Sequence, residues 1–277
     1  MPFDHHNLLT AYQVYLNFAR SSRHQDHARY IFPFFEGTYF TYRKIDVLRI
    51  VTIARAISSN PRYIDIGCGY GDFLNKVIQY IPSAIGVEKD ATIYYYLNRT
   101  KPEHIISLPI ECVTQPIDVA FVGWMEPEVD FRLRVADIAK CVITTFDEGG
   151  QCGINGGCEY EEFGYSRVAW WRTPSWIDVN HELMNSHYSR QLANDSPLRN
   201  SLRDLRSAHN LWYVYVRDEY LKNRIKSRLM DCLKKEGPTS QEEKFEFEQI
   251  LDECGFQYKT RLPSMHSSEK LWEVYFD

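Results

Sequence analysis

The chain has 277 residues, which suits one large domain or one core domain that carries an insertion. Apolar residues make up 44% of the sequence and charged residues 25%, as in ordinary soluble globular proteins with a sizeable core. The formal net charge of -5 excludes a whole-protein positive field that would attract nucleic acid, although it leaves room for a local basic patch.

The cysteines and the first residues bear on the compartment. The chain has seven cysteines, an odd number, and they are scattered, which argues for reduced thiols rather than a disulfide framework. The first residues lack the basic-then-apolar pattern of a signal peptide, and no apolar run approaches the roughly 20 residues that span a bilayer. We therefore expect a soluble, cytoplasmic protein with no membrane partner.

The first part of the chain predicts helices and then an alternation of strands and helices. Residues 1–60 form a predicted N-terminal helical segment, with an amphipathic helix at 6–20 and a helix packed on the sheet at 44–58. Between residues 61 and 147, short apolar strands at 62–66, 84–87, 104–108, 118–122 and 140–146 alternate with helices at 72–80, 92–98 and 128–138. This order predicts a doubly wound α/β fold with a mainly parallel sheet and helices on both faces.

The alternation breaks after residue 147. Residues 148–238 are predicted to form an inserted cap or substrate region, because a connection this long is usually functional. The cap would contain a glycine-rich loop at 149–157, a β-type run at 211–216 and a helix at 219–235. A helix at 241–254 and closing strands at 256–261 and 271–276 would return residues 239–277 to the core, which gives seven strands with an antiparallel last strand.

The strand at 62–66 leads into the segment that carries the chemistry. Glycines at 67, 69 and 71 let the backbone turn sharply and let a ligand approach it, and we expect their amides to cradle that ligand. Asp65 offers a carboxylate to a cationic group, and Glu88, which closes the next strand, can accept two hydrogen bonds from a ribose diol. One ligand is therefore predicted to lie across two adjacent strand ends.

The run D-I-G-C-G-Y-G at 65–71, followed by V-E at 87–88, resembles the cofactor signature of class I (Rossmann-like) S-adenosylmethionine-dependent methyltransferases. It differs from the nicotinamide fingerprint, because its glycines alternate and an acid precedes them. The resemblance covers residues 63–88, extends by strand order over 118–146, and includes the closing elements at 241–276. It implies S-adenosylmethionine as the cofactor and methyl transfer as the activity.

The resemblance also implies roles for single residues. Asp65 and Gly67 would contact the methionine part of the cofactor, Glu88 would hold the ribose, and Glu111 or Cys112 would contact the adenine. The predicted cofactor-binding set is Asp65, Ile66, Gly67, Cys68, Gly69, Gly71, Glu88, Lys89, Glu111, Gly123 and Trp124.

The end of the fourth predicted strand faces donor and acceptor in many members of this class. Here it reads Gly123-Trp124-Met125-Glu126-Pro127, without the Asn/Asp-Pro-Pro-aromatic turn of members that methylate amide or base nitrogens, which argues against such acceptors. Trp124 would wall the donor or acceptor pocket or pack in the core. Glu126 would contact the substrate or face water.

No catalytic base follows from the sequence. The candidates are Glu126, His181 and His187. For both histidines the alternative is a surface or capping role. Cys152 and Cys158 lie in the glycine-rich loop, but two thiolates need two further ligands to bind zinc, so we predict no metal site.

We therefore predict an S-adenosylmethionine-dependent methyltransferase that acts on a small molecule or a protein side chain. The acidic and aromatic residues at 159–176 suit a cationic acceptor, with aromatic packing in the core and solvated acids as the alternative. Basic residues between 203 and 228 keep an RNA methyltransferase as the alternative. A non-catalytic S-adenosylmethionine-binding regulatory module and a nicotinamide-dependent oxidoreductase are the rivals from other classes. The acceptor atom and the oligomeric state stay open.

Overall fold

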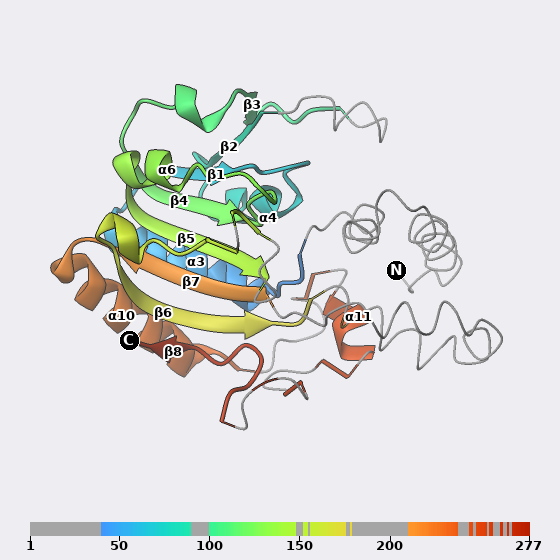
Figure 1. The fold of residues 1–277 in the computed structure, drawn as a ribbon. Helices are drawn as coiled ribbons and strands as arrows, with labels where there is room; N and C mark the ends of the chain where they lie inside the picture. Colours follow the sequence, from blue (N-terminus) through green and yellow to red (C-terminus); the bar gives the residue numbers. More distant parts are fainter. Residues whose placement is uncertain are drawn as a thin grey trace.

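A mixed sheet forms the centre of the fold. The computed structural model describes residues 40–89, 100–147, 152–154, 156–175, 178, 210–237, 244–245, 248–253, 255–256, 261–262, 265 and 268–277. Within these residues one eight-stranded sheet has the order β3-β2-β1-β4-β5-β7-β6-β8 (Figure 1). Its strands are β1 (Tyr63–Ile66), β2 (Ile85–Glu88), β3 (Ile105–Ser107), β4 (Ile117–Gly123), β5 (Ala139–Asp147), β6 (Ser166–Thr173), β7 (Asn210–Val216) and β8 (Tyr275–Phe276).

The pairing confirms the predicted Rossmann-like, doubly wound α/β class. Strands β3, β2, β1, β4 and β5 pair in parallel, and β7, β6 and β8 are each antiparallel to the strand before them in the sheet. The described sheet has eight strands instead of the predicted seven, because β6 and β7 join it from the segment that was predicted as a cap, whereas the predicted strand at 256–261 is not among the eight. The chain runs outward from β1 to β3 and then returns to β4 on the other side of β1. In such sheets, ligands bind at the carboxyl ends of the strands where this reversal occurs.

Two strands of the sheet come from residues 148–238, the segment that was predicted to form an inserted cap. β6 and β7 belong to the sheet, and β7 pairs with β5 from Cys141 to Asp147. Both strands are buried along most of their length, so their side chains are apolar and aromatic on both faces and lack the alternation that marks a half-buried strand. The predicted closing strand at 256–261 falls largely outside the described residues, and that at 271–276 is reduced to β8.

Helices cover both faces of the sheet. On one face lie α3 (Lys44–Ile57), α4 (Asp72–Ile78) and α10 (Glu219–Lys235), and on the other lies α6 (Arg132–Ile138). Shorter helices are η2 (Ile110–Cys112), η3 (Glu161–Phe163) and α11 (Glu248–Glu253). The helices predicted at 6–20 and 92–98 lie outside the described residues. In the described part of the chain, no helix is both long enough and apolar enough to cross a membrane.

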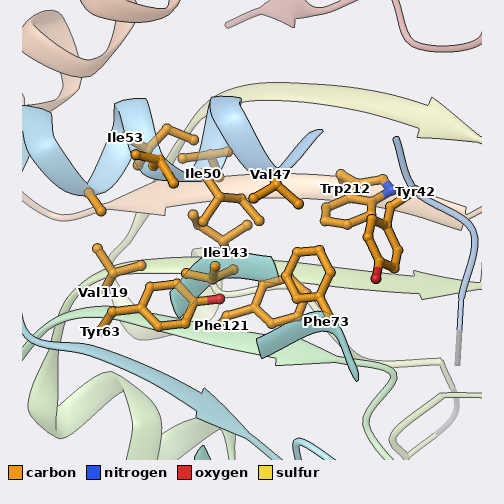
Figure 2. Packing of buried hydrophobic residues seen from close by; sticks show 14 of the residues in the cluster. Tyr42, Val47, Ile50, Ile53, Tyr63, Phe73, Val119, Phe121, Ile143 and Trp212 are labelled. Carbon is orange, nitrogen blue, oxygen red and sulfur yellow. The ribbon is translucent and has the colours of Figure 1, made fainter. Parts of the chain in front are cut away.

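The core on the α3 face shows why the helix forms where it does. Val47, Ile50 and Ile53 recur at helical spacing, are fully buried, and face the sheet residues Ile143 and Trp212 (Figure 2). Arg43 and Asp46 close the first turn, because the Arg43 amide donates to the Asp46 carboxylate at 2.7 Å. The helix thereby brings the residues just before it, 40–43, to the carboxyl edge of the sheet.

Candidate functional site

The loop between β1 and α4 depends on three glycines. Gly67, Gly69 and Gly71 have φ angles of 67°, 55° and 77°, a left-handed region that L side chains rarely adopt. A Cβ built on Gly67 or on Gly69 meets no atom within 4 Å, whereas a Cβ on Gly71 lies 2.5 Å from Cδ1 of Ile105. Gly67 and Gly69 therefore border open space, and Gly71 packs against Ile105.

The amides of this loop are occupied within the protein. Gly67 and Cys68 donate to the carbonyl of Val87 at 2.9 and 3.3 Å, and Gly71 donates to the carbonyl of Cys68 at 2.9 Å. The Gly69 amide donates to Oε2 of Glu88 at 3.0 Å. The expectation that the glycine amides cradle a ligand therefore stays a prediction. The loop supplies room for a ligand and a fixed position for the Glu88 carboxylate.

Two carboxylates stand at adjacent strand ends beside this space. Asp65, at β1, is 2% exposed and Glu88, at the end of β2, is 9% exposed. The register pairs Ile66 with Val87, so Glu88 lies one residue further along, level with the start of the glycine loop. Burial, and then the negative charge of Glu88, raise the pKa of Asp65 well above its usual range. Within the described residues, no basic side chain forms an ion pair with Asp65, so the site favours a cationic ligand.

The end of β4 is the next part of the same edge. A Cβ on Gly123 would lie 3.0 Å from the rings of Phe40 and Phe121, so Gly123 packs tightly against these aromatic rings and borders no open space there. Trp124 has a φ of 58° and donates its amide to the carbonyl of Thr145 at 2.8 Å. A bulky residue in the left-handed region costs roughly 1–3 kcal/mol and is typical of functional sites. Its partly buried side chain packs against the cores on both faces.

An ion pair joins the strands on either side of β1. Nζ of Lys89, after β2, lies 2.8 Å from Oε2 of Glu126, after β4. Both side chains are more than half exposed, and the hydrogen bond to Glu126 raises the pKa of Lys89. Glu111 is exposed on η2, and its charge also acts on Lys89. Lys89, Glu111 and Glu126, which lie far apart in the sequence, therefore lie at one edge of the sheet.

An aromatic cluster borders the glycine loop on the α3 face. The cluster consists of Phe40, Tyr42, Phe73, Phe121 and Trp212, with ring centroids 4.7 to 6.0 Å apart in the pairs that touch. Figure 2 labels all of these residues except Phe40. Burial, and then the nearby carboxylates of Asp72, Glu248 and Asp65, raise the pKa of Tyr42. Phe40 and Tyr42 were not in the predicted binding set. Their signal was an aromatic run directly before the α3 helix.

The other predicted residues have varied positions. Ile66 is 2% exposed and packs in the core on the α6 face, so only its backbone reaches the edge. The Cys68 thiol faces Gly86, where a Cβ would lie 2.6 Å from Sγ. Burial, followed by the charges of Asp65 and Glu88, raises the Cys68 pKa, which disfavours the thiolate.

The remaining candidates are His181, His187 and the cysteine pair. Both histidines lie outside the described residues. Cys152 and Cys158 are buried, and the side-chain hydrogen bond between the two residues, followed by burial, raises the pKa of Cys158. In the described part of the chain, no three His, Cys, Asp or Glu side chains gather as metal ligands would.

No protein-family model and no curated protein matches the chain. Among solved structures it is similar to the magnesium protoporphyrin IX methyltransferase ChlM from Synechocystis PCC 6803, with 10% identity, 76% of this chain and 92% of that chain covered, and a TM-score of 0.42. It is also similar to a geranyl diphosphate methyltransferase, with 11% identity, 63% of this chain and 85% of that chain covered, and a TM-score of 0.42. A third similar structure is the [4+2]-cyclase SpnF, with 11% identity, 61% of this chain and 80% of that chain covered, and a TM-score of 0.39. At these identities and TM-scores the likenesses carry no argument about the reaction.

Proposed function

We propose that the chain is an S-adenosylmethionine-dependent methyltransferase whose acceptor is a small molecule or a protein side chain. One observation carries the proposal. The open space beside Gly67 and Gly69 lies at the carboxyl ends of β1 and β2, next to two buried carboxylates, and no basic side chain of the described residues pairs with Asp65. A buried acid without a cation is costly unless a ligand provides the charge.

The residues at this edge fit the chemistry of S-adenosylmethionine. Asp65 is suited to the ammonium group of the methionine part, and Glu88, already held by the Gly69 amide, is suited to the ribose diol. Gly67 and Gly69 leave the room that a Cβ would fill. When bound, the cofactor supplies a methyl group on a sulfonium, which is activated toward nucleophiles without further chemistry by the protein.

The protein's share of the reaction is then alignment and exclusion of water. Glu88 is fixed by its hydrogen bond to Gly69, and Trp124 is fixed by its backbone bond to Thr145, so groups on both sides of β1 have set positions. Such positioning can supply much of the rate of a methyl transfer. Trp124 and Glu126 are the described residues that we assign to the acceptor side, since they follow β4, beside the glycine loop.

A matched pair of glycine variants tests the donor site. Gly69→Ala places a methyl group in the open space of the donor site, at a φ of 55°. Gly164→Ala, after η3, adds a methyl group at a φ of 80° that also meets no atom within 4 Å, but outside the glycine loop. Both should lose roughly 1–2 kcal/mol of stability, because both force alanine into the left-handed region. Only Gly69→Ala should weaken S-adenosylhomocysteine binding in calorimetry, by tenfold or more. Equal affinities in the two variants would place the ligand elsewhere.

A second experiment separates an enzyme from a non-catalytic binding module. The purified chain is incubated with methyl-labelled S-adenosylmethionine and fractionated cell extract, in which small molecules, proteins and RNA are kept apart. We expect label in the small-molecule or protein fraction, and none with Gly69→Ala. Binding of S-adenosylhomocysteine with no labelled fraction would favour the module, and label confined to RNA would favour the alternative acceptor.

A further inference from the structure

A cavity of about 420 Å³ lies away from the glycine loop, on the opposite face of the sheet from α3. Ile64, Ile85 and Val87 of β1 and β2 form its floor, and they belong to the core cluster on the α6 face. Ile106 of β3 also lines the cavity and is 42% exposed, which is high for a large apolar side chain. We call this space the crossover cavity.

The crossover cavity follows from a short connection between β3 and β4. The chain crosses the sheet from one side of β2 and β1 to the other, and the only helical element on the way is the three-residue turn η2. A crossover of this kind usually contains an α-helix that covers the sheet. Here Val113 and Gln115 of the returning segment line the cavity together with the strand residues, so a gap remains between this segment and the sheet.

The size of the cavity limits what it accepts. Two turns of an α-helix about 10 Å wide fill roughly 800 Å³, twice the volume available. A second copy of the chain needs roughly 800 Å² per partner, far more than a pocket of this size provides. A volume of 420 Å³ lies instead within the range of small-molecule pockets, which are mostly apolar with a few polar groups.

Charge narrows the class of ligand. Among the lining residues, all of which belong to the described part of the chain, Arg62 is the only charged one, and none is acidic. The neighbouring Asp118 is already engaged, because it accepts from the Arg62 amide at 2.9 Å and from Nζ of Lys140 at 2.8 Å. The Arg62 side chain is exposed and forms no ion pair with any described residue, so it remains available to an anion.

We propose that the crossover cavity binds an aliphatic chain that ends in a carboxylate, with the chain on the isoleucine and valine floor and the carboxylate at Arg62. This site is separate from the glycine loop, so it stands or falls independently of the methyltransferase proposal. Cys112, one of the two residues predicted to contact the adenine, also lines the cavity and is an exposed free thiol, so it provides a reporter when S-adenosylmethionine is absent.

The test measures how decanoate protects Cys112 of the full chain from alkylation by iodoacetamide, with the modified site read by mass spectrometry. Decanoate should slow the alkylation at least fivefold in the unmodified chain and in Leu133→Glu, a control at an exposed apolar residue of α6. Ile106→Glu, which places a charge at the cavity wall, should abolish the protection. The proposal is overturned if decanoate at its solubility limit does not protect Cys112 of the unmodified chain. It is also overturned if the protection is as strong in Ile106→Glu as in the unmodified chain.

Two further readouts test the two halves of the ligand. From hexanoate to decanoate, each added methylene should tighten binding in calorimetry by roughly three- to fourfold, until the cavity is full. Arg62→Gln should weaken the binding of decanoate by about tenfold and leave the affinity for decanol unchanged. Equal losses for decanoate and decanol would overturn the role of the carboxylate. S-adenosylhomocysteine binding, measured on the same samples, should not change in Ile106→Glu.

Discussion

Two of the regions that bury charged side chains in the described part of the chain differ in how the charge is balanced. Between α3 and the end of α10, Arg49 is fully buried and makes two hydrogen bonds to Glu236, at 2.9 and 2.7 Å, and one to Asp46 at 3.4 Å. At the carboxyl edge of the sheet, Asp65 and Glu88 are buried with no basic side chain of the described residues paired to Asp65. The first region is balanced within the chain and the second is not.

The difference indicates which region serves the fold and which serves a ligand. Arg49 also donates to the carbonyl of Trp272 at 2.8 Å, so its guanidinium joins α3, the end of α10 and the C-terminal segment. Even there, burial outweighs the attraction of Arg49 and raises the pKa of Asp46 to about 6. Asp65 has no such attraction, so its carboxylate lowers stability in the free protein unless a cation binds.

The largest effect should come from breaking the balanced region. Arg49→Met leaves Asp46 and Glu236 buried without their cation and should destabilise the chain by about 3–5 kcal/mol. Chemical denaturation measures the loss. Lys234→Ala, which removes an exposed i,i+3 ion pair with Asp231, is the control and should stay within about 0.5 kcal/mol. A similar small change for Arg49→Met would show that the buried network does not hold the helices.

The opposite result should follow from neutralising the unbalanced region. Asp65→Asn should weaken S-adenosylhomocysteine binding by about 10- to 150-fold, because it removes a charge-assisted hydrogen bond. It should also raise the free energy of unfolding at pH 7, since burial, and then the charge of Glu88, raise the Asp65 pKa and so disfavour the carboxylate in the folded state.

Asp118→Asn is the matched control for the effect on stability. Although burial opposes it, the hydrogen bond from Lys140 lowers the pKa of Asp118 below its usual value, so the folded state favours this carboxylate. Asp118→Asn should therefore lower stability at pH 7. Destabilisation by both substitutions would contradict the distinction between balanced and unbalanced acids.

The pH dependence of binding should sharpen the same contrast. Burial and Glu88 raise the Asp65 pKa in the free protein, and a bound cation would lower it again. Below the free-protein pKa, binding therefore releases a proton, so affinity for S-adenosylhomocysteine should rise with pH and level off above that pKa. Calorimetry in two buffers of different ionisation enthalpy measures the proton count. Asp65→Asn should remove most of this dependence.

The smallest effect is expected at the exposed ion pair. Lys89 and Glu126 are 55% and 62% exposed, so water and salt screen their attraction. A double-mutant cycle with Lys89→Ala and Glu126→Ala should give a coupling below about 1 kcal/mol in unfolding free energy. A coupling as large as that expected at Arg49 would mean that exposure does not decide the value of a charge pair in this protein.

The local signals of the sequence identified much of the parallel half of the sheet. The strands predicted at 62–66, 84–87 and 118–122 are β1, β2 and β4, within a residue or so at each end. Their apolar runs, and the glycines after β1, specify backbone conformation within a few residues. The positive φ angles at Gly67, Gly69 and Gly71 followed from the same signal. The roles of the predicted binding residues remain proposals.

The other half of the sheet was misassigned because strand pairing is not a local property. The run at 211–216 was recognised as β-type, but no residue near it in the sequence indicates that it pairs with β5. The segment that became β6 carries Trp170 and Trp171, and its aromatic residues indicated a pocket lining. In the structure Trp171 stacks on Trp212 with centroids 5.3 Å apart, inside the core.

The sequence alone determined that a glycine-rich turn would follow one strand, and that Asp65 and Glu88 would lie at the ends of that strand and of its neighbour. It did so because residues 65–71 and 88 are close in the chain and the α/β alternation orders their strands. Tertiary structure decided the contacts of that turn. Amides of Gly67, Cys68 and Gly69 donate hydrogen bonds to β2, and Asp65 is buried away from water with no basic side chain of the described residues paired to it. Charge balance depends on which side chains folding brings together, and Arg49 and Glu236 are 187 residues apart.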